Sequence, residues 1–424
     1  MTMTYQVPRG TRDFLPEEMK KRRRVFETAR QVLESYGYGE VNTPAFESFE
    51  LLAAKAGPDI ENEIYAFEDK SKRKLGLRFD LTVPNARIVA SNPAMAKPAK
   101  FYTIDRMWRY DKPQAGRYRE FWQASYEIFG SSEPEADAEV IAVVNSVLQQ
   151  VSITEYYFRI NSRKIIDRLA KIAGIPESKT GDAFRAIDKL DKLGEKEARG
   201  EMERYKIPEK AISKFISMTR LKEKDLLLEI SKDPDAMKDY EELKQVVEFA
   251  EKMNVKNIKI DLSIVRGIGY YTGFVFETFV KGKEGLGSIA SGGRYDNLVE
   301  QFGGKPTAAT GCGIGLDRLM DLVPDTDYDK SGYAKVFVAA VKDEVRGSAI
   351  EIASMLRKEN IATDIDLMKR NLKKQFDYCN SKNIQYCVIV GPQELVEKQV
   401  TVRDMQTGSE EKVQIMGLAR YLQK

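Results

Sequence analysis

The chain has 424 residues, 42% of them hydrophobic, so it is long enough to form two or three packed domains. Its 68 basic and 65 acidic residues give a formal net charge of only +3, which excludes a large positive field and confines any contact with RNA to a local surface. The chain contains no histidine, which excludes a histidine general base, a Ser-His-Asp triad and every histidine-ligated metal site.

The cysteine content and the hydropathy pattern predict a cytoplasmic protein that has no membrane contact. Cys312, Cys379 and Cys387 are too few and too scattered for a disulfide framework or for a zinc site made of paired cysteines. No stretch approaches the roughly 18–20 apolar residues of a membrane span, and the first residues lack the apolar core of a signal peptide.

A long amphipathic helix is predicted to begin at Pro16, because proline and the two glutamates that follow it suit a first helical turn. Apolar residues then recur at helical spacing from Val25 to Tyr36, and Gly37 ends the pattern. Residues 38–44 are typical of an extended strand that ends at a proline. Any α/β domain can contain a helix followed by a strand, so this pattern alone assigns no function.

Two short runs, Ile64–Phe67 and Lys74–Phe79, flank a polar turn and predict a β-hairpin. The hairpin leads into Asp80, Leu81 and Thr82 at the expected start of a helix. The simplest role for an aspartate and a threonine at this position is to cap the helix, because both side chains accept hydrogen bonds from free backbone N–H groups.

Residues 101–130 are predicted to form a longer β-hairpin, in which residues 111–116 supply the proline and glycine of the loop. Alternation places Gln123, Ser125 and Glu127 on one face of the second strand and apolar side chains on the other. Two interpretations of the polar face remain open. It faces water, or it is buried and its polar groups are hydrogen-bonded to a ligand.

Four arginines favour the second interpretation. Arg106, Arg109, Arg117 and Arg119 lie on or beside the loop of the hairpin. Because guanidinium groups bind phosphate through paired hydrogen bonds, arginines beside a polar strand indicate a site for an anionic, planar ligand such as a nucleotide.

The middle of the chain is predicted to be mainly helical. An amphipathic helix is expected over 133–152 and a strand over 156–160. Residues 167–255 then contain 19 basic and 20 acidic residues and almost no strand pattern. Such balanced charge is typical of a helical insertion with a solvated surface and gives no strong case for RNA binding.

Glycine-rich segments follow. Residues 258–277 predict two strands, interrupted after Arg266 by two glycines that form a bulge or let a ligand approach the backbone. Residues 291–296, SGGRYD, predict a second glycine-rich turn, and residues 311–318 predict a turn between a strand and a helix.

Two common nucleotide-binding motifs are absent from these glycine-rich segments. A dinucleotide-binding fingerprint would need a glycine at Leu316, and the run Gly303-Gly304-Lys305 fails as a phosphate-binding loop because a proline follows the lysine. Any nucleotide site must therefore be of another kind.

The pattern changes after a polar linker at 325–332. Short apolar strands alternate with helices, which predicts a parallel-sheet domain from Gly332 onward. The strands are expected at 336–341, 362–366 and 386–390, the helices at 345–358 and 372–381, two edge strands at 399–405 and 412–415, and a final helix at 418–424.

These segments resemble, in the same order, the motifs of the histidyl-tRNA synthetases, a family of class II aminoacyl-tRNA synthetases. The N-terminal helix and strand resemble motif 1, the dimer element, and residues 311–318 resemble motif 3. Arg109, the loop PQAGRYREF, Gln123 and Glu127 resemble motif 2.

A further segment resembles the motif peculiar to this family. It consists of Arg266 followed by Tyr270-Tyr271-Thr272-Gly273. Gly269 stands where the family commonly has aspartate, and Asp80 stands where many relatives have glutamate.

The resemblance implies an α/β fold with three parts. These are a class II catalytic core at 1–166 and 256–324, whose mixed and mainly antiparallel sheet is flanked by helices, a helical insertion at 167–255, and an α/β anticodon-binding domain at 332–424. It also implies a homodimer that uses ATP, with accompanying Mg²⁺ and no protein-ligated metal, to convert L-histidine into histidyl-adenylate. The histidyl group then passes to the 3′ end of the cognate tRNA.

The resemblance assigns roles to individual residues. Arg109 and Arg266 are expected to be the catalytic residues, and Glu127 and Tyr271 the partners of the imidazole nitrogens. The histidine-binding residues that it implies are Asp80, Leu81, Thr82, Arg109, Gln123, Glu127, Arg266, Tyr270, Tyr271 and Thr272. The ATP-binding residues that it implies are Arg109, Arg117, Tyr118, Phe121 and Arg318.

These residue types suit the reaction without a protein base. The attacking carboxylate is already ionised at neutral pH, so the site must supply alignment and stabilise charge at the α-phosphate. Two non-catalytic alternatives remain: the synthetase-like regulatory subunit of ATP phosphoribosyltransferase, and a synthetase-like module that senses uncharged tRNA. The intact motif at Arg266 and the domain from Gly332 onward oppose the first alternative.

Overall fold

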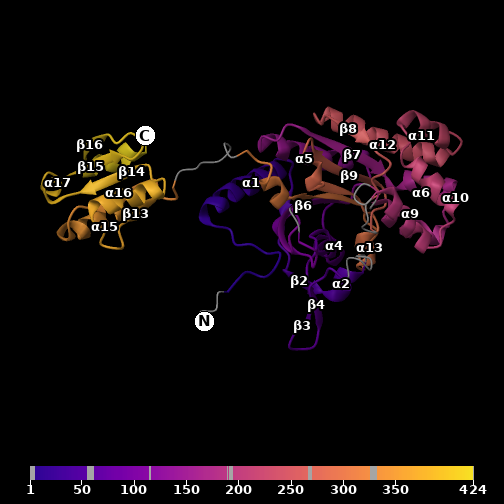
Figure 1. Cartoon of the computed structure of the whole chain (residues 1–424), viewed down its shortest axis with the longest axis horizontal. Coiled ribbons are helices and arrows are strands. Elements are labelled where there is room, and N and C mark those ends of the chain that lie inside the picture. Colours follow the sequence, from indigo (N-terminus) through magenta and orange to yellow (C-terminus); the bar gives the residue numbers. More distant parts are fainter. Residues whose placement is uncertain are drawn as a thin grey trace. The chain divides into compact units, whose positions relative to one another are not determined.

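The computed structural model describes residues 5–54, 62–113, 116–188, 190, 194–265, 270–324 and 332–423 (Figure 1). The chain divides into two compact units, Met1–Asp327 and Tyr328–Lys424, and each has a hydrophobic core of its own. The first unit contains an eight-stranded and a three-stranded sheet, and the second contains a five-stranded sheet. The predicted α/β fold with a mixed central sheet is confirmed.

The central sheet of the first unit has the strand order β1-β5-β6-β11-β10-β9-β7-β8. Only the outermost pairs, β1 with β5 and β7 with β8, are parallel, and the pairs between them are antiparallel. The strands are β1 Gly39–Glu40, β5 Ala99–Trp108, β6 Glu120–Phe129, β7 Tyr156–Ser162, β8 Ile258–Ile260, β9 Phe274–Val280, β10 Ala290–Arg294 and β11 Ala309–Gly315.

The predicted long hairpin is confirmed as β5 and β6. Its second strand pairs with β11, so that Glu127 lies opposite Gly311 and the segments resembling motifs 2 and 3 are neighbours. The strand predicted at 38–44 is much shorter, because only Gly39 and Glu40 join the sheet.

The prediction of a turn at 291–296 is wrong, because most of that segment belongs to β10. The glycines of β10 allow the backbones of β11 and β9 to pack closely against it. A Cβ atom on Gly292 would lie 2.0 Å from the carbonyl oxygen of Gly311, and one on Gly293 would lie 2.2 Å from that of Phe274. The glycines serve close strand packing here.

Two long helices, α1 (Pro16–Ser35) and α5 (Pro134–Gln150), pack on one face of the central sheet. Apolar side chains of both helices share a core with Ala124 and Tyr126 of β6, and the Tyr126 hydroxyl donates to the carbonyl oxygen of Val140 at 2.6 Å. The opposite face of β6 meets α4 (Thr82–Ser91), and α13 (Leu298–Gln301) packs against α4. The short helix α14 (Leu316–Met320) follows β11 directly, as predicted for residues 311–318.

Residues 163–252 form helices within the described part of the segment (Figure 1). The helices are α6 Arg163–Ala173, α7 Thr180–Asp188, α9 Glu195–Arg204, α10 Glu209–Met218, α11 Glu223–Ile230 and α12 Pro234–Lys252. The last of them packs against α5, and the side chains of Lys164 and Glu242 tie it to α6 at 2.6 Å.

The three-stranded sheet has the order β2-β4-β3 and lies beside α2 (Phe49–Ala53). Its strands are β2 Phe46–Ser48, β3 Ala66–Glu68 and β4 Lys74–Leu77. The predicted hairpin of residues 64–79 is therefore confirmed, with a third strand added.

The second unit has a sheet in the order β13-β12-β14-β15-β16, of which the first three strands are parallel. This confirms the predicted alternation and the two additional strands, of which β16 lies at the edge and β15 lies between β14 and β16. The elements are β12 Val336–Ala340, α15 Arg346–Lys358, β13 Thr363–Ile365, α16 Leu372–Ser381, β14 Tyr386–Val390, α17 Pro392–Val396, β15 Gln399–Asp404, β16 Glu410–Gln414 and α18 Leu418–Leu422.

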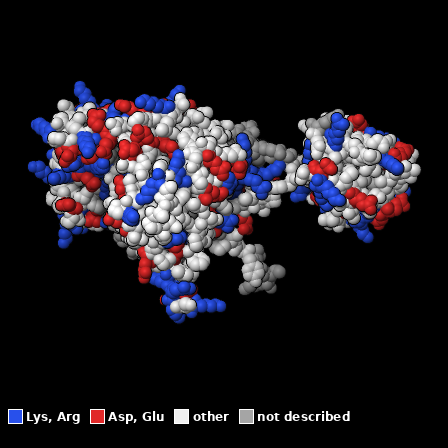
Figure 2. All heavy atoms as spheres, turned by 180° about the vertical axis from the view of Figure 1, so that it is seen from behind, with Lys and Arg blue, Asp and Glu red and all other residues white. Residues whose placement is uncertain are grey.

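Short 3₁₀ helices complete the description: η1 Glu177–Lys179, η2 Glu284–Leu286, η3 Asp343–Val345 and η4 Ile415–Gly417. Basic and acidic side chains are interspersed over both units on the face shown in Figure 2. Within the described ranges, no helix combines the length and the apolar character that crossing a membrane requires.

Candidate active site

A buried polar cluster lies where β6 and β11 pair beneath the first turns of α4. Ser125 and Glu127 project from the face of β6 opposite Ala124 and Tyr126, and neither has any exposed surface. The interpretation that the polar face of this strand is in water is therefore wrong for Ser125 and Glu127. Gln123, which lies two residues before Ser125 on the same face of β6, is half-buried.

The carboxylate of Glu127 accepts hydrogen bonds from three side chains. The hydroxyls of Thr82 and Ser125 donate to Oε1 at 3.1 and 3.0 Å, and Asn85 Nδ2 donates to Oε2 at 2.7 Å. Burial raises the pKa of Glu127 to about 7, the three donors lower it, and the nearby Asp80 raises it. A buried carboxyl group that ionises near neutral pH makes this cluster a candidate functional site.

Two glycines of β11 make space for this cluster. A Cβ atom on Gly311 would lie 2.8 Å from Glu127 Cγ and 3.0 Å from the hydroxyl oxygen of Tyr295. One on Gly313 would lie 1.9 Å from Gln123 Nε2. The backbone of the segment that resembles motif 3 therefore packs directly against the side chains of Glu127, Tyr295 and Gln123, because glycine has no side chain at these two positions.

Asp80 both caps α4 and keeps one oxygen unpaired. Its Oδ1 accepts from the backbone N–H of Val83 at 3.0 Å, as the capping interpretation predicts. Its Oδ2 is buried and has no hydrogen-bond partner among the described residues. Burial raises the pKa of Asp80, and the N–H of Val83 and the charge of Arg109 lower it. Thr82 does not cap the helix, because its hydroxyl donates to Glu127.

Arg109 and Phe121 lie together near Asp80. Arg109 Nε donates to the carbonyl oxygen of Phe79 at 2.9 Å, and its guanidinium carbon is 5.4 Å from the centre of the Phe121 ring. The backbone thus holds the guanidinium through one nitrogen, which leaves its outer edge to bind an anion.

The arginine of the segment that resembles motif 3, Arg318, contacts the hairpin loop. Arg318 donates from Nε to the carbonyl oxygen of Gly116 at 3.0 Å and from Nη1 to that of Ser288. Arg117 forms an ion pair with Asp111 through its Nε atom. This contact uses the Nε atom, so a phosphate would be bound by the outer nitrogens of the Arg117 guanidinium.

The remaining aromatic residues fall into two groups. Arg12 stacks its guanidinium 3.6 Å from the centre of the Tyr118 ring, next to the loop. Tyr270 and Tyr271 are buried with ring centroids 4.9 Å apart, and Tyr295 lies 5.6 Å from Tyr270.

Sequence reasoning missed two residues of this site, Asn85 and Tyr295. The Tyr295 hydroxyl is buried without a hydrogen-bond partner in the described part of the chain. Burial and the charge of Glu127 raise its pKa. The place of Tyr295 in the glycine-rich segment SGGRYD was the available signal, whereas nothing in the sequence distinguished Asn85 from other helical residues.

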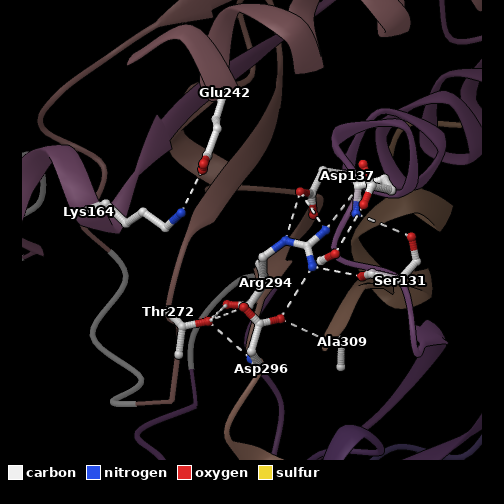
Figure 3. A network of polar contacts seen from close by, with 10 residues as sticks. Ser131, Asp137, Lys164, Glu242, Thr272, Arg294, Asp296 and Ala309 are labelled. Atoms are coloured by element: carbon white, nitrogen blue, oxygen red, sulfur yellow. Dashed lines mark hydrogen bonds and ion pairs between the residues drawn. The ribbon is translucent and has the colours of Figure 1, made fainter. Parts of the chain in front are cut away.

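Thr272 lies in a separate polar network (Figure 3). Its hydroxyl accepts from the backbone N–H of Asp296 at 3.0 Å. The same network is centred on the buried Arg294, which binds Asp137 at 2.8 Å and the carbonyl oxygen of Ser131 at 2.9 Å. These contacts connect β10 to α5 and hold Thr272 in place beside Tyr271.

Three further expectations concern Leu81, the segment around Arg266, and a metal ion. Leu81 is fully buried, so only its backbone is available to a ligand. Arg266 and Gly269 lie outside the described residues. In the part of the chain that the structure describes, no group of three or more carboxylate or thiol side chains could hold a metal ion.

Comparison with known proteins decides the family. The family model described as histidyl-tRNA synthetase matches residues 10–319, and the one described as anticodon binding domain matches residues 335–424. The chain belongs to the histidyl-tRNA synthetase family. The predicted resemblance is therefore confirmed.

Relatives and solved structures agree over the whole length. The chain is 40% identical to the histidine–tRNA ligase of Pyrococcus furiosus, with 98% of each chain covered. It is 39% identical to that of Methanocaldococcus jannaschii, with 99% of this chain and 100% of the relative covered. The histidyl-tRNA synthetase structure from Nostoc superposes with a TM-score of 0.81 at 29% identity, covering 100% of this chain and 99% of that one.

A structure named for both of the leading interpretations shares the fold. The ATP phosphoribosyltransferase regulatory subunit/histidyl-tRNA synthetase from Bacillus halodurans C superposes with a TM-score of 0.75 at 24% identity, covering 92% of this chain and 99% of that one. At that level of identity the likeness concerns the fold alone.

Proposed function

We propose that this protein forms histidyl-adenylate from L-histidine and ATP and transfers the histidyl group to the 3′ end of its tRNA. The observation that carries this proposal is the buried Glu127, which ionises near neutral pH under a lining of hydroxyl and amide donors. Such a carboxylate suits an imidazole N–H, and the relatives at 39–40% identity are named histidine–tRNA ligases.

The ammonium group and the imidazole ring of histidine would each meet a complementary group. The unpaired Oδ2 of Asp80 would accept from the substrate ammonium, and Glu127 with Tyr271 would bind the two ring nitrogens. Gln123, Thr82 and Tyr270 would complete the histidine pocket, with the backbone of Leu81 and with Thr272 supporting it from the sides. Leaving such buried polar groups unpaired would reject other amino acids by about 10⁴–10⁵.

The adenylation step needs no proton transfer to or from the protein. An oxygen of the histidine carboxylate attacks the α-phosphorus of ATP, a new O–P bond forms, and the bond to the β-phosphate oxygen breaks to release pyrophosphate. Arg109 and Arg266 would be the catalytic residues, because they would align the carboxylate with the α-phosphate and stabilise the charge that develops there.

ATP would lie along the hairpin loop. Phe121 would stack on adenine, and Arg117, Tyr118 and Arg318 would contact the outer phosphates. Mg²⁺ bound to these phosphates would neutralise part of their charge. No protein-ligated metal is needed.

We further propose a cytoplasmic homodimer with no membrane contact, in which α1 and the strand after it form the dimer element. Support for a reducing compartment comes from the three cysteines, which are all buried and form no disulfide. We propose the division into a catalytic core at 1–166 and 256–324, a helical insertion at 167–255 and an anticodon-binding domain at 332–424.

Histidine-dependent exchange of pyrophosphate into ATP tests the proposal. Purified, folded protein should catalyse exchange with L-histidine and not with the other amino acids, and should then charge histidine tRNA. Absence of exchange from folded protein would favour the non-catalytic regulatory subunit. Exchange with no charging of tRNA would refute the second half of the proposal.

A further inference from the structure

The two oxygens of Glu127 are not satisfied equally. Among the residues that the structure describes, Oε1 accepts from two hydroxyl groups, those of Thr82 and Ser125, whereas Oε2 accepts from one donor, the amide of Asn85. An ionised carboxylate has room for about four hydrogen bonds. The remaining capacity therefore lies mainly on Oε2, the oxygen that Asn85 contacts.

Asn85 is itself unusual. Its side chain has no exposed surface, its Nδ2 lies 2.7 Å from Oε2 of Glu127, and its Oδ1 is buried without a partner among the described residues. Turning the amide round would place Oδ1 against Oε2, which only a protonated Glu127 would tolerate. In the present orientation the amide donates to Oε2, which favours the ionised form of Glu127.

We propose that Asn85 is a positioning residue for histidine recognition, which keeps Glu127 ionised and turns its Oε2 atom toward the imidazole N–H of the substrate. This inference rests on the proposed function. It assigns to α4 a specificity role besides the one that Asp80 and Thr82 have.

Several groups around Glu127 determine how strongly the hydrogen bond from Asn85 affects the ionisation of Glu127. Asp80 opposes ionisation, and the three donors favour it. Among the described residues, the hydroxyls of Tyr38 and Tyr295 also interact electrostatically with Glu127, and both are neutral at pH 7 because burial raises their pKa values. Arg109 interacts with Asp80. Because the pKa of Glu127 is about 7, loss of one donor moves its ionisation across neutral pH.

The test is the pH dependence of kcat/KM for L-histidine in the exchange reaction, between pH 6 and 9, for Asn85→Leu against the unmodified protein. Loss of one hydrogen bond to a charged group should move the acid limb upward by about one pH unit. At pH 6.5 the variant should lose about tenfold in kcat/KM, and at pH 9 it should recover to within about threefold. The loss should appear in KM for histidine, with KM for ATP unchanged.

The imidazole of the substrate also titrates in this range, but it does so identically for both proteins and cancels in the comparison. Asn145→Leu is the matched control. Asn145 is a buried asparagine on α5 whose Oδ1 accepts from the Tyr156 hydroxyl at 2.6 Å, away from Glu127. This variant should lower the melting temperature and leave the acid limb in place.

A folded Asn85→Leu variant whose profile runs parallel to that of the unmodified protein at every pH would overturn the inference. If the leucine variant does not fold, Asn85→Ala, which only removes atoms, decides the question by the same profile. No exchange by the unmodified protein would overturn the proposed function instead, so the two failures are distinguishable.

Discussion

Replacing Gly313 by alanine should impair histidine binding and leave the fold intact. The new Cβ atom would lie 1.9 Å from Nε2 and 2.5 Å from Cδ of Gln123, far inside van der Waals contact. The atoms that it meets are the end of a flexible side chain, so Gln123 can rotate away while β11 keeps its position. The same change at Gly292 would meet backbone at 2.0 Å and would disrupt the sheet.

The size of the effect follows from what Gln123 would lose. One hydrogen bond to a charged group of the substrate is worth about 1.5–3 kcal/mol. At about 1.4 kcal/mol per factor of ten, kcat/KM for histidine should fall by about 10–100-fold. The KM for ATP should stay within about threefold, and the melting temperature should change by only a few degrees, because the overlap is relieved by rotation.

Pyrophosphate exchange at saturating ATP measures this loss. Gly315→Ala is the control on the same strand, because its Cβ atom would lie 3.5 Å from the nearest carbonyl oxygen, an ordinary contact. Gln123→Ala should reproduce the loss, and adding Gly313→Ala to it should cost little more. Unchanged histidine kinetics in Gly313→Ala, or a full further loss in the double variant, would refute the reasoning.

Three further predictions concern stability and the division of labour. Because the pKa of Glu127 is about 7 in the folded chain against about 4.5 for a free side chain, the folded state binds more protons between these values and the free energy of unfolding falls as pH rises through them. This decline in the free energy of unfolding is about 3 kcal/mol at most, and the Glu127→Gln variant should not show it. Urea unfolding at pH 5 and pH 8 measures the decline, and an unchanged decline in the variant would show that Glu127 does not cause it. Arg294→Met should destabilise the chain by about 3–5 kcal/mol because it leaves Asp137 buried without its partner, and Asp137→Leu in the same chain should restore most of the loss in thermal melting. Deleting residues 332–424 should preserve pyrophosphate exchange and abolish charging of tRNA, and equal loss of both activities in a folded core would contradict the proposed domain roles.

Much of the fold could be predicted from the sequence, because its signals are local. Alternation along 101–130 identified the β5–β6 hairpin and the polar face of Gln123, Ser125 and Glu127, since side chains of a strand alternate whatever its neighbours are. The alternation of strands and helices after residue 332 identified the second unit for the same reason.

Only the tertiary structure decided what those residues face. Asn85 is 42 positions from Glu127, so their contact leaves no local pattern. Tyr295 follows β10, and the pairing of β10 with β11 brings its hydroxyl beside Gly311 and Glu127. The glycines at 292 and 293 looked like a turn because glycine suits turns and close strand contacts equally, and the strand order chose between them. The pKa of Glu127 likewise depends on burial and on donors from α4, which are properties of packed neighbours.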